Sequence, residues 1–351
     1  MQNKGEFMDK SITNCLVTGA TGYLGTVLVR MLHEKGLNVT SLVFPDEDIK
    51  HISKYSNIRY ADVCDKDALE QEVMGYDIII HLAGIIDISS RNRDLMKRVN
   101  IGGTRNVAEL CLKHNIKLIY CSSVHAIPCL PKNEIMTERT DFDSVKVKGL
   151  YSKTKAEATK TVLEMIKQGL NAMIAFPSGI IGPYERKLTN IGQVICDFLC
   201  GELTAYVDGG YNFVDVRDVA NGIYKMIENW KSGESYILSG YEISVGQMIS
   251  EVAKASGKKM LRTKLPYWFA LGTSYFAEFY YFIRRKKPLY THYSVKTLRN
   301  NCSFSNQKAR DNIGFYPRPL SESLFDMTNW IIENFLLKTG NKYKPTRKTI
   351  Q

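Results

Sequence analysis

The first residues that could do chemistry are a tyrosine and a lysine four positions apart, Tyr151 and Lys155. The surrounding pattern predicts a helix over Leu150–Gln168, and residues four apart share one face of a helix. A phenol, with an ordinary pKa of about 10, is a poor acid or base at neutral pH. A neighbouring ammonium group favours the phenolate and moves the tyrosine pKa toward the working range. The pair is therefore a candidate proton donor and acceptor.

Two adjacent serines, Ser122 and Ser123, follow an apolar run that predicts a strand over Lys117–Cys121. Ligands of open parallel sheets bind beyond the carboxyl ends of the strands. A serine hydroxyl at that edge can donate a hydrogen bond to a substrate oxygen.

A glycine-rich segment, Thr18–Gly25, follows the first predicted strand and opens the next helix. Gly19 permits a tight turn, Gly22 lets the backbone approach a pyrophosphate, and Gly25 allows close packing of helix on strand. The free amides at the helix N-terminus favour phosphate groups. This combination predicts a dinucleotide-binding turn.

Other reaction classes lack their motifs. No HExxH, GxSxG or P-loop sequence is present, which disfavours zinc hydrolysis, ester hydrolysis and kinase chemistry. His81 and His125 are interpreted as structural residues, although His125 could border a pocket. The eight cysteines form no CxxC pair, and Cys196 and Cys200 have no nearby histidine, so we expect no metal site. Several cysteines lie in apolar runs, which indicates reduced thiols and a cytoplasmic protein.

The charge of the chain is concentrated near its end. The 351 residues carry a net charge of +11, of which residues 284–351 contribute +10. No zinc finger, zipper or RNP-like run is present, so we expect no nucleic-acid partner. The basic segment suits an anionic substrate, an anionic lipid surface or a solvated tail. The N-terminus has no apolar signal-peptide region, and the composition excludes a mostly disordered or fibrous chain.

An aromatic segment, Leu265–Ile283, precedes the basic cluster Arg284–Lys287. Its length is near that of a transmembrane helix, but Pro266 and Glu278 interrupt it, so we expect no membrane span. We expect instead a helix whose inner face walls an apolar substrate pocket, with a loose contact between its exposed remainder and an anionic membrane. Four of its residues are expected to be buried: Trp268, Phe269, Phe276 and Phe279.

Strands and helices alternate through the first half of the chain, which indicates a parallel sheet covered by helices on both faces. Continuous apolar runs such as Ile78–Leu82 are typical of strands buried on both sides. The expected strands are Ile12–Val17, Val39–Phe44, Ile58–Ala61, Ile78–Leu82, Lys117–Cys121 and Asn171–Phe176. The expected helices are Tyr23–Glu34, Arg93–His114, Leu150–Gln168 and Leu320–Leu337, with a strand and then a helix over Asn212–Trp230.

The alternation breaks after Pro177, where proline, glycine and aromatic residues become frequent. We therefore expect an α/β fold of Rossmann type, a doubly wound parallel sheet, with a smaller and discontinuous substrate-binding lobe. The expected boundaries are a flexible 1–10, a nucleotide-binding domain over 11–177 and about 211–239, a substrate lobe over about 178–210 and 240–320, a helix over 320–337 and a basic tail over 338–351.

With these motifs in order, the chain resembles the extended branch of the short-chain dehydrogenase/reductases over about residues 12–337. The matching segments are TGATGYLG from Thr18, HLAG from His81, NIGGT from Asn100, YSKTK from Tyr151, PSGIIGP from Pro177 and FVDVRDVA from Phe213. The resemblance implies a catalytic set of Ser123, Tyr151 and Lys155, with Ser122 as the alternative serine and Asn100 kinking its helix and holding a water in the proton relay. It implies a homodimer through the helices Arg93–His114 and Leu150–Gln168.

The resemblance also implies which residues bind the cofactor, with Asp62 and Val63 at the adenine. The full set is Gly19, Thr21, Gly22, Tyr23, Leu24, Gly25, Phe44, Asp62, Val63, Leu82, Ala83, Gly84, Tyr151, Lys155, Pro177, Gly179 and Ile180. The second strand ends in Val43-Phe44, which is neither the acid of NAD-preferring relatives nor the arginine of NADP-preferring ones. We expect NAD or NADP, and the nearby Lys50 and His51 favour NADP.

Three activities are consistent with these residues. The first is interconversion of a secondary alcohol and a ketone on an apolar, ring-containing substrate, as in the 3β-hydroxysteroid dehydrogenases and dihydroflavonol reductases that the chain resembles. The second is nucleotide-sugar epimerisation, and the third is a non-catalytic dinucleotide sensor. Val124-His125 stand where sugar-nucleotide dehydratases carry an acidic pair, which disfavours dehydration. The aromatic segment favours the first activity, and the intact Ser-Tyr-Lys set argues against the third.

Overall fold

The computed structural model describes residues 12–86, 92–207, 209–274 and 292–338. Its centre is a sheet of seven parallel strands in the order β10-β6-β5-β4-β1-β2-β3. The strands are β1 (Asn14–Thr18), β2 (Asn38–Val43), β3 (Asn57–Tyr60), β4 (Ile78–His81), β5 (Lys117–Cys121), β6 (Ala172–Pro177) and β10 (Ser235–Leu238). The strand order reverses between β1 and β4, where doubly wound sheets bind their ligands. The expected fold class is confirmed, and the six predicted strands agree with the structure to within two residues.

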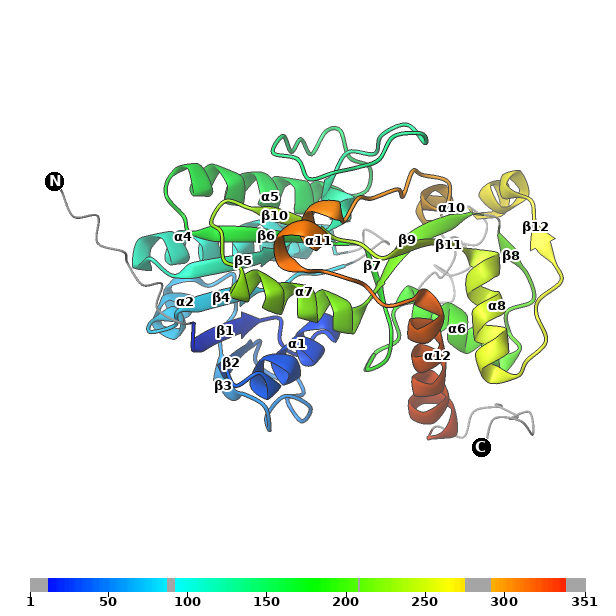
Figure 1. The fold of residues 1–351 in the computed structure, drawn as a ribbon, viewed down its shortest axis with the longest axis horizontal. Coiled ribbons are helices and arrows are strands. Elements are labelled where there is room, and N and C mark those ends of the chain that lie inside the picture. The colour runs from blue at the N-terminus through cyan, green and yellow to red at the C-terminus, as the bar shows by residue number, and fades with distance from the viewer. Residues whose placement is uncertain (1–11, 87–91, 208, 275–291, 339–351) are drawn as a thin grey trace.

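Helices cover both faces of this sheet (Figure 1). On one face lie α1 (Tyr23–Glu34), α7 (Val216–Glu228) and α11 (Gln307–Ile313), and on the other α2 (Lys66–Val73), α4 (Thr104–His114) and α5 (Leu150–Lys167). The side chains of β4 alternate between the two helical layers, and Ile78, Ile79 and Ile80 are fully buried. Such burial on both sides is why this strand is an unbroken apolar run.

The helix predicted over Arg93–His114 is interrupted by a π-helical turn. It consists of α3 (Arg93–Lys97), the turn η1 (Arg98–Gly103) and α4. Asn100 lies in this turn and is 1% exposed. A π turn inserts a residue into the helical register, and it is frequent at functional sites.

A smaller lobe follows the large sheet. Its strands form a three-stranded sheet, β11-β9-β7, and a two-stranded pair, β12-β8. These are β7 (Gly179–Ile181), β8 (Tyr206–Val207), β9 (Gly210–Asp215), β11 (Tyr241–Ser244) and β12 (Lys264–Leu265). The helices around them are α6 (Asn190–Cys200), α8 (Val245–Ser256), residues 267–274, α10 (His292–Thr297) and α12 (Leu320–Ile331), the last continuing through the π turn η3 (Ile332–Leu337). The lobe has its own apolar core, in which α12 packs against α6 and α8.

The aromatic segment departs from its prediction. Residues 267–274 are helical, but Trp268 is 73% exposed and Phe269 is 43% exposed, so their predicted burial is wrong. Ala270 faces inward against Val207 and Val295, which turns the two aromatic rings outward. Phe276, Phe279 and the basic cluster 284–287 lie outside the described residues. In the described parts of the chain, no helix is both long and apolar enough to cross a membrane.

Candidate active site

A cavity of about 510 Å³ opens at the carboxyl edge of the large sheet, between the sheet and the small lobe. Many of the residues predicted from the sequence meet there. Those that line it are Gly19, Gly22, Tyr23, Leu24, Gly25, Leu82, Gly84, Ser122, Ser123, Tyr151, Lys155, Pro177, Gly179 and Ile180. Residues more than 130 positions apart in sequence therefore share one site, because the parallel strands β1, β4, β5 and β6 end at the same edge.

The glycine-rich turn forms a cradle that side chains would fill. Gly19 has a φ of +67°, and a Cβ there would lie 2.7 Å from the backbone nitrogen of Ala83. A Cβ on Gly25 would collide with the backbone of the same turn. Gly22 caps α1 without any side-chain hydrogen bond to the first amides. These amides and the helix dipole fit a pyrophosphate, so the turn suits a dinucleotide.

Ser123, Tyr151 and Lys155 come together in the same cavity. Burial raises the pKa of Tyr151 above its ordinary value, and the charge of Lys155 and a hydrogen bond with Ser123 oppose that rise only in part. Lys155 is 5% exposed, and its Nζ donates to the carbonyl oxygen of Cys121 at 2.9 Å. A fixed cation beside a buried phenol is the arrangement that makes a tyrosine usable as an acid and base.

The two serines after β5 differ in how their hydroxyls are engaged. Ser122 Oγ lies 2.7 Å from Thr159 Oγ1 of α5, and both side chains are buried. Ser123 Oγ accepts a hydrogen bond from the backbone of His125 at 3.2 Å, which leaves its own proton available to Tyr151 or a ligand. The geometry favours Ser123 as the substrate-facing serine.

Asn100 does not line the cavity, but it fixes the chain that does. Its Oδ1 accepts from the backbone nitrogen of Ile85 at 2.7 Å, and its Nδ2 donates to the oxygen of Ile85 and to Thr154 Oγ1. A Cβ on Gly84 would lie 3.3 Å from Asn100 Oδ1 and 3.5 Å from Lys155 Nζ. The π turn thus anchors the exit of β4 beside Lys155.

The remaining predicted cofactor residues lie outside this cavity. Phe44 follows β2 and is 54% exposed. Asp62 follows the neighbouring β3, where its Oδ1 accepts from the backbone nitrogen of Cys64 at 2.9 Å. Val63 packs against Gly103 in η1. Since β2 and β3 pair in parallel, Phe44 and Asp62 lie at one sheet edge, as an adenine site would require.

Acidic and basic groups near the glycine-rich turn are separated. Thr21 Oγ1 donates to Glu47 Oε2 at 2.5 Å, which places a carboxylate against the turn. Lys50 and His51 instead line a second cavity of about 790 Å³ on the far side of α1. None of Glu47, Lys50 and His51 lines the cavity that holds Ser123, Tyr151 and Lys155.

His125 lines the cavity, as its place after Ser123 suggested, and it contacts a tyrosine that no sequence motif indicated. His125 Nε2 lies 3.0 Å from the hydroxyl of Tyr211 of β9, and the two rings are stacked. The ring of His125 also meets that of Tyr151 edge-on, with centroids 5.9 Å apart. Burial lowers the pKa of His125 to about 4, so the imidazole is neutral. Tyr211 carried no sequence signal, because its position depends on the pairing of β9 with the distant strands β7 and β11.

Ser178 is a second residue that the site prediction omitted. It lines the cavity between Pro177 and Gly179 and is 7% exposed, yet its hydroxyl has no hydrogen-bond partner in the described structure. A buried, unpaired hydroxyl is unfavourable unless a ligand or water completes it. Its position within PSGIIGP was the available signal.

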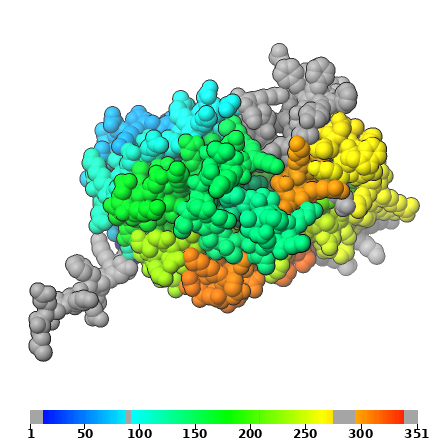
Figure 2. Space-filling view, turned by 90° about the horizontal axis from the view of Figure 1, so that it is seen from above, coloured from blue at the N-terminus to red at the C-terminus, as the bar shows by residue number. Residues whose placement is uncertain are grey.

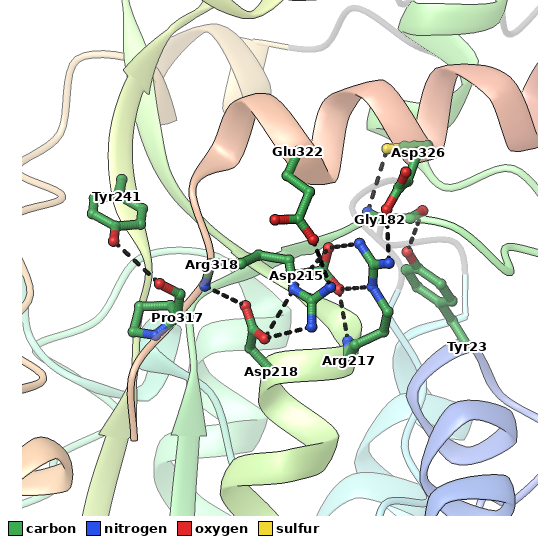
Figure 3. Close-up of polar contacts among 11 residues, drawn as sticks. Tyr23, Gly182, Asp215, Arg217, Asp218, Tyr241, Pro317, Arg318, Glu322 and Asp326 are labelled. Atoms are coloured by element: carbon green, nitrogen blue, oxygen red, sulfur yellow. Dashed lines mark hydrogen bonds and ion pairs between the residues drawn. The ribbon is translucent and has the colours of Figure 1, made fainter. Parts of the chain in front are cut away.

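Buried charges join the cofactor turn to the small lobe (Figure 3). The hydroxyl of Tyr23 donates to the carbonyl oxygen of Gly182 at 2.6 Å. Gly182 has a φ of +124°, and a Cβ there would lie 3.1 Å from the carboxylate of Asp215. Asp215 pairs with Arg217 at 2.8 Å, and Arg217 reaches Asp326 of α12 at 2.7 Å. This network fixes how the small lobe meets the first turn of α1.

Comparison with known proteins places these features in a family. A model described as the NAD dependent epimerase/dehydratase family matches residues 15–240. A Synechocystis sp. protein named "Putative dihydroflavonol 4-reductase" is 29% identical, over 92% of this chain and 96% of its own. Sterol demethylase protein B of Methylococcus capsulatus is 25% identical, over 92% of this chain and 99% of its own.

Solved structures agree with this placement. The crystal structure of gox2253 superposes with a TM-score of 0.80 at 31% identity, covering 94% of this chain and 99% of that one. A nucleoside-diphosphate-sugar epimerase from Pseudomonas aeruginosa, PA4631, gives a TM-score of 0.73 at 21% identity, covering 92% of this chain and 98% of that one. The second likeness shows the fold alone.

Proposed function

The chain belongs to the NAD-dependent epimerase/dehydratase family, the extended short-chain dehydrogenase/reductases, and on that premise we propose that it interconverts a secondary alcohol and a ketone on an apolar, ring-containing substrate. The observation that carries the proposal is the Ser123–Tyr151–Lys155 set at the wall of the 510 Å³ cavity. A bound nicotinamide supplies or accepts hydride. The rest of the chemistry falls to the protein.

Each member of the set has a distinct task in this proposal. Tyr151 donates a proton to the forming alkoxide in reduction and removes the hydroxyl proton in oxidation. Lys155 stabilises the phenolate form of Tyr151 by its charge, and the Cys121 carbonyl holds it in place. Ser123 donates a hydrogen bond to the substrate oxygen and so orients the reacting carbon. General acid–base catalysis of this kind contributes about 10²–10⁴-fold in rate.

The walls of the cavity favour an apolar substrate. Beyond the catalytic set, its lining includes Ile86, Leu150, Ile191 and Phe213. The relatives named above support the same class, because their names refer to a dihydroflavonol and to a sterol. A relative from Arabidopsis thaliana, 24% identical over 88% of this chain, is named 3beta-hydroxysteroid-dehydrogenase/decarboxylase isoform 1. Nucleotide-sugar epimerisation is the second candidate, since the same catalytic set serves it.

We propose NAD rather than NADP as the working cofactor. Glu47 contacts Thr21 in the glycine-rich turn, where a carboxylate can bind a ribose diol and would repel a 2′-phosphate. Lys50 and His51, which favoured NADP from the sequence, line a cavity beside Arg30 and Tyr184. The hydrogen bond from Thr21 to Glu47 is the contact with the turn that supports NAD.

Two assembly and compartment proposals accompany this function. We propose a homodimer through the neighbouring helices α4 and α5, which the family resemblance implies; light scattering after size exclusion would test it. We propose a reducing, cytoplasmic setting, which the eight free cysteines support. A blocked-thiol assay on protein from native cells would contradict that setting if it found the cysteines oxidised.

Absorbance at the reduced-nicotinamide band separates the two candidate activities. The protein is incubated with NAD or NADP and hydroxysteroids, flavanonols or UDP-sugars. The proposal expects net reduction of NAD with a hydroxysteroid, and net oxidation of NADH with a ketosteroid or with a flavanonol, whose ring carbonyl accepts the hydride. Conversion of a UDP-sugar without net absorbance change would establish epimerisation instead.

A further inference from the structure

The far end of the small lobe exposes two adjacent aromatic side chains. Trp268 is 73% exposed and Phe269 is 43% exposed, although the helix that carries them is anchored by buried Ala270. We call residues 257–274 the terminal face; they form the yellow end of the molecule in Figure 2. An indole that extends into water is unfavourable unless something covers it.

Positive charge surrounds these rings, and no acid lies among them in sequence. From Gly257 to Ser274 the chain has four basic residues and no aspartate or glutamate. Lys259, Arg262 and Lys264 are exposed. Arg299 adds a fifth cation, with its guanidinium 4.0 Å from the centroid of the Tyr267 ring.

The charged and aromatic groups share one groove. A depression of about 370 Å³ is lined by Lys264, Leu265, Pro266, Tyr267, Trp268 and Arg299. It therefore offers cations at its rim and apolar surface between them. Such a groove suits a ligand with an anionic group attached to an apolar body.

We infer that the terminal face docks on the surface of an anionic phospholipid bilayer. Indole and phenyl rings partition into the headgroup region of membranes, and lysine and arginine near an anionic leaflet each strengthen attachment. A second copy of the chain is a poor occupant, because two such faces would bring like charges together. The groove between Lys264 and Arg299 would receive a lipid phosphate while Trp268 enters the interface.

This docking goes beyond the proposed reaction and rests on surface features alone. It would bring the enzyme to a phase in which apolar ring compounds dissolve, but it does not require that Tyr151 be catalytic. Binding and turnover can therefore fail separately.

Vesicle co-sedimentation of the full chain tests the inference. The probes are phosphatidylcholine vesicles with and without phosphatidylserine. We expect binding only with phosphatidylserine, weakening as salt is raised. Replacing Lys259, Arg262 and Lys264 by glutamine should weaken binding about 100-fold, at roughly five-fold for each charge. Trp268→Ala with Phe269→Ala should weaken it about 10-fold or more.

A matched control changes the same charge elsewhere. Lys35, Lys54 and Lys231 are exposed lysines of the large-sheet domain that lie outside α4 and α5, and their replacement by glutamine should leave binding within about two-fold. Equal losses in this control would show a merely non-specific attraction and overturn the inference. Absence of binding by the wild type would also overturn the inference. A fall in the molar mass of the protein in solution on Trp268→Ala would do the same, because it would show that these rings contact a protein partner instead.

Insertion of the Trp268 indole into the bilayer can be measured by fluorescence quenching, which charge attraction alone would not produce. Brominated phosphatidylcholine in the phosphatidylserine vesicles should quench the fluorescence of Trp268, and Trp268→Phe should abolish the quenching. The two other tryptophans lie elsewhere. Trp230 follows α7 and donates to Asn171, and Trp330 lies in α12 and donates to the carbonyl oxygen of Glu185. Quenching that persists in Trp268→Phe would contradict the inference.

Discussion

The cofactor side of the cavity and its substrate side differ in how their functional groups are held. On the cofactor side, a Cβ on Gly19 would collide with the backbone of Leu82 and Ala83 directly after β4, and the amine of Lys155 is held by a strand carbonyl. On the substrate side, Ser178 Oγ has no partner in the described structure, and His125 and Tyr211 meet through stacked rings. The large sheet thus holds the groups of the cofactor side in place, whereas a bound substrate would complete the hydrogen bonding of the substrate side.

That difference explains why we expect the two sides to respond differently to substitution. The cofactor side must match one invariant molecule, so its groups are held by secondary structure whose geometry leaves few choices. The substrate side lies on loops and on a small sheet, where residues can change without disturbing the large sheet. We therefore expect substitutions on the cofactor side to abolish activity and those on the substrate side to redirect it.

The largest expected effect is that of Tyr151→Phe on the cofactor side. The ring is retained, so packing against His125 survives, but the proton donor is lost. Turnover should fall about 10³-fold or more, while cofactor affinity changes by less than about three-fold. Steady-state rates and fluorescence titration with NADH measure the two quantities. A variant that turns over like the wild type would remove Tyr151 from the mechanism.

The next effect distinguishes the two serines on the boundary between the sides. Ser123→Ala should lower kcat by about 10- to 100-fold, because it removes a hydrogen bond to the reacting oxygen. Ser122→Ala serves as the matched control and should change kcat by less than about three-fold, since its hydroxyl pairs with Thr159. The reverse ranking would shift the catalytic register by one residue.

A smaller effect concerns the choice between the two dinucleotides. Glu47→Arg should lower the affinity for NAD and raise that for NADP, changing their ratio by about 10- to 100-fold. The physical reason is that a guanidinium binds a 2′-phosphate where a carboxylate repels it. The ratio of kcat/KM values measures the change, with Glu47→Gln as a neutral control. An unchanged ratio in both variants would place the ribose elsewhere.

The smallest effect is a shift in the pH dependence of stability. The folded-state pKa of His125 is about 4, below the ordinary value of 6.5. The unfolded chain therefore binds a proton at this residue from about pH 6.5 downward, and stability falls as pH falls toward 4. In His125→Phe the slope of unfolding free energy between pH 5 and pH 6 should be smaller by about 1 kcal/mol per pH unit. Urea unfolding measures it, and an equal slope in both proteins would mean that the imidazole is not buried.

The sequence predicted the large sheet well because that sheet leaves a periodic trace. Buried strands such as β4 and β5 have apolar sequences without interruption. The glycine motif that begins at Gly19 indicates a close approach between two backbone segments. The helix α2 was missed because Lys66–Val73 is short and mostly polar, with only Leu69 and Val73 buried.

The small lobe could not be predicted in the same way. β9 lies in the segment that looked like a further unit of the large sheet, but it pairs with β7 and β11. Such pairing depends on contacts distant in sequence, so no local pattern announces it. The burial expected for Trp268 and Phe269 was wrong for a related reason. Aromatic content does not indicate which face of a helix packs against the rest of the protein, and here the face with Ala270 does so.

Transfer of a labelled hydride tests the central claim most directly. The protein is incubated with NADH deuterated at C4 and a ring-containing ketone of the steroid or flavonoid class, and the product is analysed by mass spectrometry. The account predicts one deuterium on the new carbinol carbon, formed by the wild type and about 10³-fold more slowly by Tyr151→Phe. No labelled alcohol from either class, together with conversion of a UDP-sugar and no net change in the cofactor, would contradict it.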